Sequence, residues 1–148
     1  MENVKIDYSE NAERIPGFLL WQVSKLWQRT LNAALEDLEL SSTQAIILGN
    51  IVRMVGQKKL VTQISLSEVT KVDPMTTSQA IRTLEKKKLI KRVVAKDDKR
   101  AFSVLPTKQG VQVTLKALQR IAEAHEEFFE PLEQELESFG KELQQLMM

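Results

Sequence analysis

The sequence predicts a mainly α-helical protein that carries one small β-hairpin. Apolar residues recur at 3-4 spacing along most of the chain, which is the period of a helix with one buried face. Only five glycines and four prolines occur among the 148 residues, so long irregular segments are not expected. Residues 89–105 are the exception, because their β-branched and apolar residues approach the two-residue period of a strand.

The first expected helix follows a polar arm (residues 1–13) and opens at Ile15-Pro16. Its apolar stripe consists of Leu19, Leu20, Val23, Leu26, Trp27, Leu31, Ala34, Leu35 and Leu38. A second helix is expected to start at the capping box formed by Ser41 and Gln44, and Gly56 is a natural end for it. The stripe of this helix consists of Ile47, Leu48, Ile51, Val52 and Val55.

The next two helices are expected to be close together in the chain. Thr62 is a candidate cap for a short third helix, in which Ile64, Leu66 and Val69 are expected to be buried. Asp73-Pro74 then places an acidic cap before a proline at the first helical position, which predicts a fourth helix running to about Lys88. The turn between them is only a few residues long, as a helix-turn-helix requires.

The C-terminal half is expected to contain the hairpin and two more helices. Strands over 89–95 and 101–105 flank a polar hairpin loop over 96–100, and Thr107 can cap a long fifth helix that Pro131 breaks. The expected stripes are Val111, Leu115, Leu118, Ala122 and Phe129 in the fifth helix, and Leu132, Leu136, Phe139, Leu143 and Leu146 in the last.

This order of elements predicts one domain over residues 1–148, a winged helix-turn-helix lobe at 41–105 framed by helices at both ends. The outer helices, at 14–38 and 107–148, are too apolar to stand alone. We therefore expect them to form the interface of a homodimer.

Composition excludes several classes of chemistry. Without cysteine there is no disulfide, thiolate zinc site or cysteine nucleophile, and the single histidine, His125, leaves no imidazole pair for a metal or a catalytic relay. We expect no enzyme activity, no metal and no cofactor. No apolar run approaches the ~18 residues of a membrane span, and no signal peptide is recognisable, so a cytoplasmic protein without membrane contact is expected.

Charge is unevenly distributed although the net charge is only +1. Residues 74–100 hold nine Lys and Arg against three acids, whereas residues 119–148 hold two basic residues against eight Glu. A basic segment beside an acidic one suggests a surface directed at a polyanion, although solvated helix faces also segregate charge by chance.

The fourth helix offers an outward polar face when it is projected at about 100° per residue. Thr77, Ala80, Ile81 and Leu84 point to the core, while the outward set is Met75, Thr76, Gln79, Arg82, Thr83 and Lys86. Arg82 is suited to guanine and Gln79 to adenine in a major groove, and Thr76 and Ser78 lie in the first turns, where a helix favours phosphate. The alternative is an ordinary solvated helix surface. The position between a short helix and a hairpin favours duplex DNA.

The expected hairpin loop offers a second contact. Arg100 can enter a minor groove, Asp98 can brace its guanidinium, and Lys99 adds positive charge. A charged turn with no partner is the alternative.

The segment Leu66–Arg92, LSEVTKVDPMTTSQAIRTLEKKKLIKR, resembles the helix-turn-helix of MarR-family transcription regulators. Asp98-Lys-Arg100, followed by Pro106-Thr-Lys-Gln-Gly110, resembles that family's wing signature of Asp-x-Arg, then Leu-Thr and a nearby Gly. Two positions depart from the pattern, because Lys88 replaces the usual Gly after the recognition helix and Pro106 replaces Leu.

The resemblance implies an obligate homodimer with a recognition helix in the major groove and a wing arginine in the minor groove. We expect a repressor of a pseudo-palindromic operator, with a small aromatic or phenolic effector as a candidate partner whose binding residues the sequence does not assign. A winged-helix protein–protein interaction module without DNA binding is the competing hypothesis. Trp21 and Trp27 are expected to pack in the core and His125 to lie on an ordinary surface or interface.

Overall fold

The computed structural model describes residues 12–95 and 98–148, and this part of the chain is mainly helical. Its elements are η1 (Ala12–Arg14), α1 (Pro16–Ala34), η2 (Glu36–Leu38), α2 (Ser42–Gly56), α3 (Gln63–Thr70), α4 (Pro74–Lys86), β1 (Ile90–Ala95), β2 (Asp98–Pro106), α5 (Lys108–Phe128), η3 (Glu130–Leu132) and α6 (Leu136–Leu146). The strands form one antiparallel hairpin. The predicted fold class, helices with a single β-hairpin, is confirmed.

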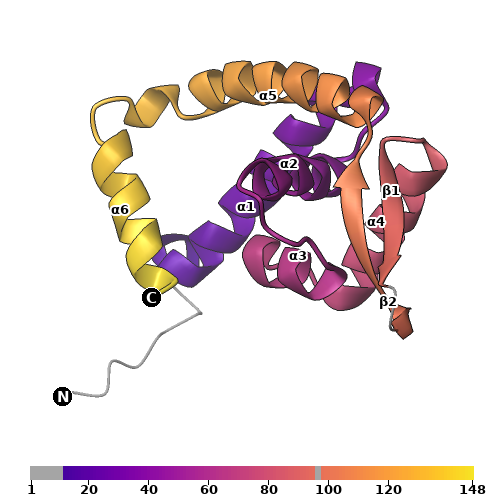
Figure 1. Cartoon of the computed structure of the whole chain (residues 1–148). Coiled ribbons are helices and arrows are strands. Elements are labelled where there is room, and N and C mark those ends of the chain that lie inside the picture. Colours follow the sequence, from indigo (N-terminus) through magenta and orange to yellow (C-terminus); the bar gives the residue numbers. More distant parts are fainter. Residues whose placement is uncertain (1–11, 96–97) are drawn as a thin grey trace.

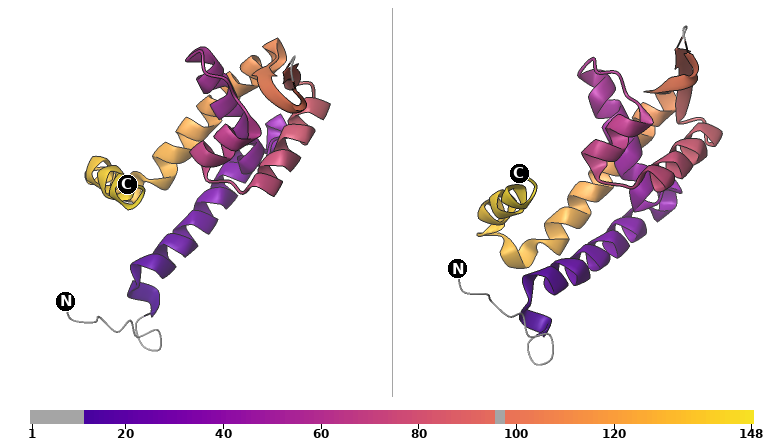
Figure 2. Two further views of the ribbon diagram at one scale, coloured as in Figure 1. Left: turned by 60° about the horizontal axis from the view of Figure 1, so that its bottom comes forward. Right: turned by 90° about the horizontal axis from the view of Figure 1, so that it is seen from below.

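The elements fall into two groups, which we call the lobe (α2, α3, α4, β1 and β2) and the frame (α1, η2, α5, η3 and α6). Helices α2, α3 and α4 lie together with the hairpin at one end, while α5 runs from the hairpin towards α6 at the other end (Figure 1). Helix α1 packs against α5, and α6 stands away from the lobe in all views (Figure 2). No helix in residues 12–95 or 98–148 is long and apolar enough to cross a membrane.

The core lies inside the lobe, where α2 is the central helix. The side chains that are less than 2% exposed come from α2, α3, α4, both strands, the residue before η2 and the loop before α3. They are Leu35, Ile47, Leu48, Ile51, Val61, Leu66, Thr77, Ile81, Leu84, Ile90 and Val104. In contrast, neither α1 nor α6 has a buried residue of its own within the chain. Burial of apolar area therefore holds the lobe together, and the frame keeps much of its apolar surface exposed.

All four predicted N-caps are confirmed. The side-chain oxygens of Ser41, Thr62, Asp73 and Thr107 accept hydrogen bonds from the backbone N–H three residues later, at the starts of α2, α3, α4 and α5. Each bond satisfies a donor that has no partner inside its helix, which fixes where the helix begins.

Several element ends differ from the prediction. Helix α1 ends at Ala34, so that Leu38 lies in η2, and α4 ends at Lys86 rather than Lys88. The expected loop over 96–100 is too long, because β2 already begins at Asp98. Pairing of Asp98 with Ala95 extends the hairpin beyond what its polar composition suggests.

Three residues that were predicted to be buried are exposed. Ile64 is 72% exposed and Val69 46% exposed, so that only Leu66 of the predicted trio is buried in α3. An eight-residue helix presents little more than one residue per turn to the core, and α3 packs through that one side. Trp21 is 62% exposed rather than packed in the core, with the Lys25 ammonium 4.7 Å from its ring centre.

The end of α4 and the start of α5 meet in an arrangement that we call the α4–α5 joint, formed by Lys88, Leu89, Thr107 and Gly110. Lys88 has a φ of 62°, and the N–H groups of Lys88 and Leu89 donate to the carbonyls of Glu85 and Leu84. This is a Schellman end, built on lysine where glycine is usual.

Thr107 completes the joint from the other side. Its hydroxyl donates to the Lys88 carbonyl at 2.7 Å, and its N–H donates to the Leu89 carbonyl at 3.0 Å. A Cβ on Gly110 would lie only 2.0 Å from the Leu89 carbonyl oxygen. Glycine is therefore required where α5 begins, because the two backbones approach too closely for any side chain.

Candidate DNA-binding surface

The turn between α3 and α4 is held by side-chain hydrogen bonds to backbone carbonyls. The Ser67 hydroxyl donates to Val72 at 2.6 Å, and the Gln63 amide nitrogen donates to Pro74 at 3.1 Å. Lys71, with a φ of 62°, makes the sharp change of direction. These contacts fix α4 relative to α3. Sequence reasoning missed Gln63 and Ser67, because only the folded turn brings them to their partners.

One side of α4 is anchored and the other is free. The four residues predicted to face the core, Thr77, Ala80, Ile81 and Leu84, are all buried. Met75, Gln79, Arg82 and Lys86 are exposed and follow one another at spacings of four, three and four residues. They form a single stripe along the helix, which we call the α4 stripe.

The N-terminus of α4 is closed by its own cap. The two carboxylate oxygens of Asp73 accept the Thr76 N–H at 2.8 Å and the Thr76 hydroxyl at 2.7 Å. The hydrogen bond from the Thr76 backbone, followed by that from its hydroxyl, lowers the pKa of Asp73 below its usual value. A negative charge therefore occupies this helix end. Thr76 and Ser78 are both half-buried, and their contact with phosphate remains a prediction.

The hairpin is fastened to the lobe at its base. The Val104 N–H donates to the Val61 carbonyl at 2.9 Å, and Arg92 pairs with Glu85 at 3.3 Å while its guanidinium lies 4.5 Å from the centre of the Phe102 ring. This orients the strands relative to α4. The side chains of Asp98, Lys99 and Arg100 lie outside the described part of the structure, so their roles as wing contacts remain predictions.

The described basic residues between positions 74 and 100 divide into two groups. Arg92 is paired with Glu85, and the Lys87 ammonium donates to the Glu39 carbonyl, so both hold the lobe together. The exposed cations of the second group are Arg82, Lys86, Lys88 and Lys91. Among the described residues none of these four forms an ion pair, which leaves their charge available to a polyanion.

A crevice of about 800 Å³ lies between the frame and the lobe. It is lined by residues of α1, α2, α5 and the α3–α4 turn, including Trp27, Ile46, Arg53, Lys71 and Leu118. Among the described residues its charged lining consists of Arg53 and Lys71, with no carboxylate, so it favours an apolar molecule with a negative group. The sequence left such effector residues unassigned, because they come from four separate segments.

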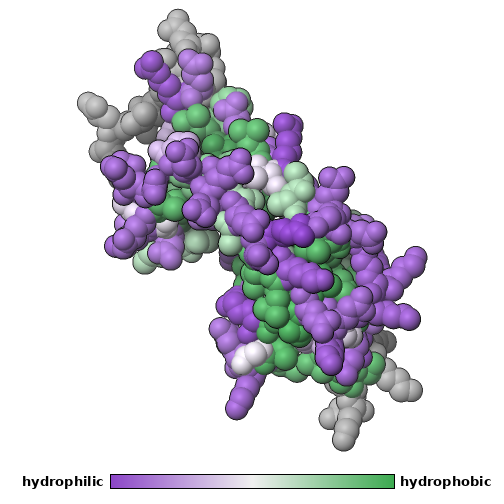
Figure 3. All heavy atoms as spheres, turned by 90° about the horizontal axis from the view of Figure 1, so that it is seen from above, coloured by the Kyte–Doolittle hydropathy of each residue, from purple (hydrophilic) through white to green (hydrophobic). Residues whose placement is uncertain are grey.

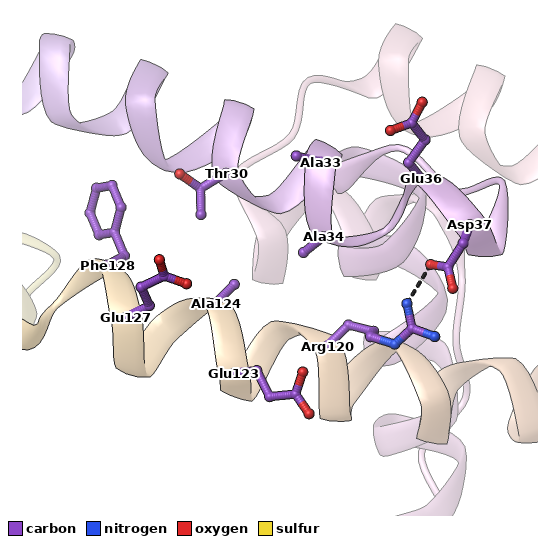
Figure 4. Close-up of a pocket in the computed structure, with 10 residues that line it drawn as sticks. All are labelled: Thr30, Ala33, Ala34, Glu36, Asp37, Arg120, Glu123, Ala124, Glu127 and Phe128. Atoms are coloured by element: carbon purple, nitrogen blue, oxygen red, sulfur yellow. Dashed lines mark hydrogen bonds and ion pairs between the residues drawn. The ribbon is translucent and has the colours of Figure 1, made fainter.

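A second hollow, of about 970 Å³, lies between the end of α1 and the middle of α5 (Figure 4). Arg120 reaches across it to Asp37 at 2.5 Å, which lowers the pKa of that carboxyl. Glu36, Glu123 and Glu127 also line the hollow, so its charge disfavours an anion. The charged lining of the crevice is therefore positive, whereas that of the second hollow is mainly negative.

Exposed apolar side chains are frequent on the frame. On α1 they are Phe18, Leu19, Leu20, Trp21, Val23 and Leu26, on α5 Val111, Leu115 and Leu118, and near the C-terminus Leu132, Leu146, Met147 and Met148. Figure 3 shows hydrophobic surface in several patches between polar side chains on one face.

Where α1, α5 and α6 approach one another, an aromatic cluster joins them. The Trp27 ring centre lies 5.9 Å from that of His125 and 5.0 Å from that of Phe128, and Phe129 continues to Phe139 at 6.2 Å. His125 thus belongs to an aromatic contact between helices, and Trp27 joins this cluster to the crevice.

Comparison with known proteins agrees with this geometry. A MarR family model matches residues 38–101. The HTH-type transcriptional regulator YdcH of Bacillus subtilis (strain 168) is 33% identical over 132 residues, which cover 89% of this chain and 89% of that protein. The chain belongs to the MarR family. MarR-family proteins regulate transcription and are not enzymes, as the composition predicted.

Solved structures of similar proteins share this fold. A crystal structure of a mutant MarR from E. coli, complexed with operator DNA, matches with a TM-score of 0.78 at 25% identity, covering 92% of this chain and 96% of that one. CouR from Rhodococcus jostii RHA1, bound to p-coumaroyl-CoA, matches with a TM-score of 0.79 at 22% identity, covering 93% and 95%. Because CouR is only 22% identical to this chain, its likeness shows a shared fold alone.

Proposed function

We propose that this MarR-family regulator is a repressor that binds a pseudo-palindromic operator as a homodimer. The observation that carries the proposal is the α4 stripe, a row of exposed side chains on a helix that hydrogen bonds hold rigidly in a helix-turn-helix. A helix placed in this way enters the major groove with one face towards the bases. The operator complex of the similar E. coli MarR supports the same use of the fold.

Each proposed contact follows from the chemistry of its side chain. Arg82 forks onto guanine, Gln79 pairs with adenine, and Lys86 binds phosphate further along the groove. Ser78 contributes a phosphate contact near the start of α4, and the sequence predicts the same for Thr76, whose N–H and hydroxyl are bonded to Asp73 in the free protein. At the wing, Asp98 braces Arg100 for the minor groove and Lys99 adds a phosphate contact.

The test starts by selecting bound duplexes from random-sequence DNA with the full-length protein. We expect a two-fold symmetric consensus, because a symmetric dimer presents α4 twice. Arg82→Ala should then cost about 1–3 kcal/mol and relax the preference at one base position of each half-site.

Lys59→Ala, which removes an exposed cation of the lobe outside the α4 stripe, is the control and should leave the base preference unchanged. Uniform weakening of all sequences by Arg82→Ala would make Arg82 a phosphate contact. Failure to select any sequence would favour the alternative of a protein–protein interaction module.

We further propose that a small aromatic or phenolic anion releases this repressor by binding in the 800 Å³ crevice. Arg53 and Lys71 match its negative group, and Trp27 matches its ring. The structure of CouR with p-coumaroyl-CoA supports a ligand of this kind in the fold family.

The effector proposal is tested with 4-hydroxybenzoate as the probe, on a Trp21→Phe variant in which Trp27 is the remaining tryptophan. Binding should quench Trp27 fluorescence and lower operator affinity together, and Arg53→Gln should weaken both effects. Quenching without any loss of operator affinity would contradict effector release.

A further inference from the structure

Met75 is an apolar side chain on the otherwise polar outward face of α4. It is 73% exposed in the first turn of α4, among the highest exposures of any large hydrophobic residue in the lobe. The exposed apolar residues of α1, α5 and α6 belong to the frame, whereas Met75 begins the α4 stripe that continues with Gln79, Arg82 and Lys86. A dimer formed by the frame therefore does not explain its exposure.

The cap of α4 also affects what can bind beside Met75. Both carboxylate oxygens of Asp73 are engaged with the N–H and the hydroxyl of Thr76, so a phosphate beside Met75 would meet a negative charge. Residues at the start of a recognition helix instead approach base edges. Among the groups exposed in the major groove, the thymine C5-methyl is the apolar one.

We propose that Met75 recognises a thymine through contact with its C5-methyl group, which makes it a determinant of operator specificity. This inference rests on the proposed function, because it requires α4 to lie in the major groove. Methionine suits the role, since its flexible, polarisable thioether adapts to a small apolar target. The remaining stripe then supplies hydrogen bonds, and Met75 supplies the apolar contact that they cannot make.

The experiment uses the selected operator duplex with its thymines replaced one at a time by deoxyuridine, which removes only the methyl group. We expect one position of each half-site at which replacement weakens binding of the wild-type protein by about fourfold, the value of burying one methyl-sized group. Met75→Ala removes the contact from both half-sites of the dimer, so it should weaken binding to the thymine duplex by about sixteenfold and show no further loss on replacement at that position. Gln79→Ala, one turn along the stripe, should weaken binding but keep the methyl effect.

Because Met75 is exposed, Met75→Ala should keep the wild-type circular dichroism spectrum and thermal midpoint. If Met75→Ala retains the wild-type loss on deoxyuridine at every position, the assignment is overturned while DNA binding stands. If the wild-type protein selects no duplex, both the assignment and the proposed function fail.

Discussion

Three lysines adopt backbone angles that glycine usually takes. Lys58, Lys71 and Lys88 have φ values of 60°, 62° and 62°, and each follows a helix, whereas none of the described glycines has a positive φ. A left-handed residue other than glycine costs about 1–2 kcal/mol. The ammonium charge offsets part of this cost, because it lies near the partly negative C-terminal end of the helix. At these turns the protein therefore loses some folding stability and gains exposed positive charge.

Lys88→Gly should raise the free energy of unfolding by about 1 kcal/mol, because it relieves the left-handed strain. Lys86→Gly is the control and should lower it by about 1 kcal/mol, since Lys86 has helical angles. Urea titration measures both. A Lys88→Gly protein that is less stable than wild type would show that the lysine side chain outweighs the strain.

The Asp73 cap makes stability depend on pH. Because the pKa of Asp73 is lowered in the folded protein, its contribution is complete above the unfolded value near 4 and is lost as the pH falls through the folded value. Asp73→Asn should flatten the fall of the urea midpoint in this acidic range, while differing little near pH 7, because Asn is also a good cap.

Asp37 serves as the second carboxyl in this measurement, since its pKa is lowered by Arg120. Asp37→Asn should flatten the same range, and the double variant should flatten it further. Identical acid profiles for Asp73→Asn and wild type would contradict the role assigned to the cap.

At the scale of elements, local chemistry was predictable and tertiary contact was not. The caps at Ser41, Thr62, Asp73 and Thr107 follow from residues within one helical turn, so the sequence was sufficient to place them. The exposure of Ile64 depends on which neighbours surround a short helix, and apolar spacing alone does not contain that information.

The candidate site also has parts that the sequence predicts and parts that only the folded structure shows. The α4 stripe was predictable, because a helical projection separates its exposed and buried faces. The crevice was not, since Trp27, Arg53 and Lys71 meet only after α1, α2 and the α3–α4 turn have packed. The Asp73–Thr76 contact also needed the structure, because the sequence does not show which oxygen meets which hydrogen.

Gly110→Ala should destabilise the protein by about 1–3 kcal/mol, because the added methyl group collides with the Leu89 carbonyl across the α4–α5 joint. Gly49→Ala is the matched control within α2, where nothing lies within 4 Å of the new Cβ, and it should stabilise the protein by up to about 1 kcal/mol. The thermal unfolding midpoints of the two variants measure both effects. Equal effects of the two substitutions would show that the joint yields without cost.

At the scale of the molecule, the apolar frame implies a partner of the same kind. Residues 14–38 and 107–148 expose large side chains on α1, α5 and α6, while most of the buried core lies in the lobe within 41–105. An exposed apolar surface of this kind favours self-association. We propose that the two frames interlock and leave both lobes free for DNA.

Leu20→Glu should therefore convert the dimer to a monomer at micromolar concentration, because it places a charge in the proposed apolar interface. Ile64→Glu is the control, since Ile64 is more exposed but lies on α3 in the lobe. Sedimentation velocity measures both. A wild-type protein that sediments as a monomer would contradict the proposed assembly.

The α4–α5 joint has a mechanical consequence for the proposed dimer. Helix α5 has 21 residues and is therefore about 32 Å long, which is close to the ~34 Å between successive major grooves on one side of DNA. Since its first turn is fastened to the end of α4 and it packs along α2 and α1, we propose that α5 acts as a lever arm with α4 at its tip. A tilt of about 10° at the far end moves that tip by about 5 Å, roughly one and a half base pairs. We therefore expect small changes among the frame helices to be amplified into loss of register with the proposed operator.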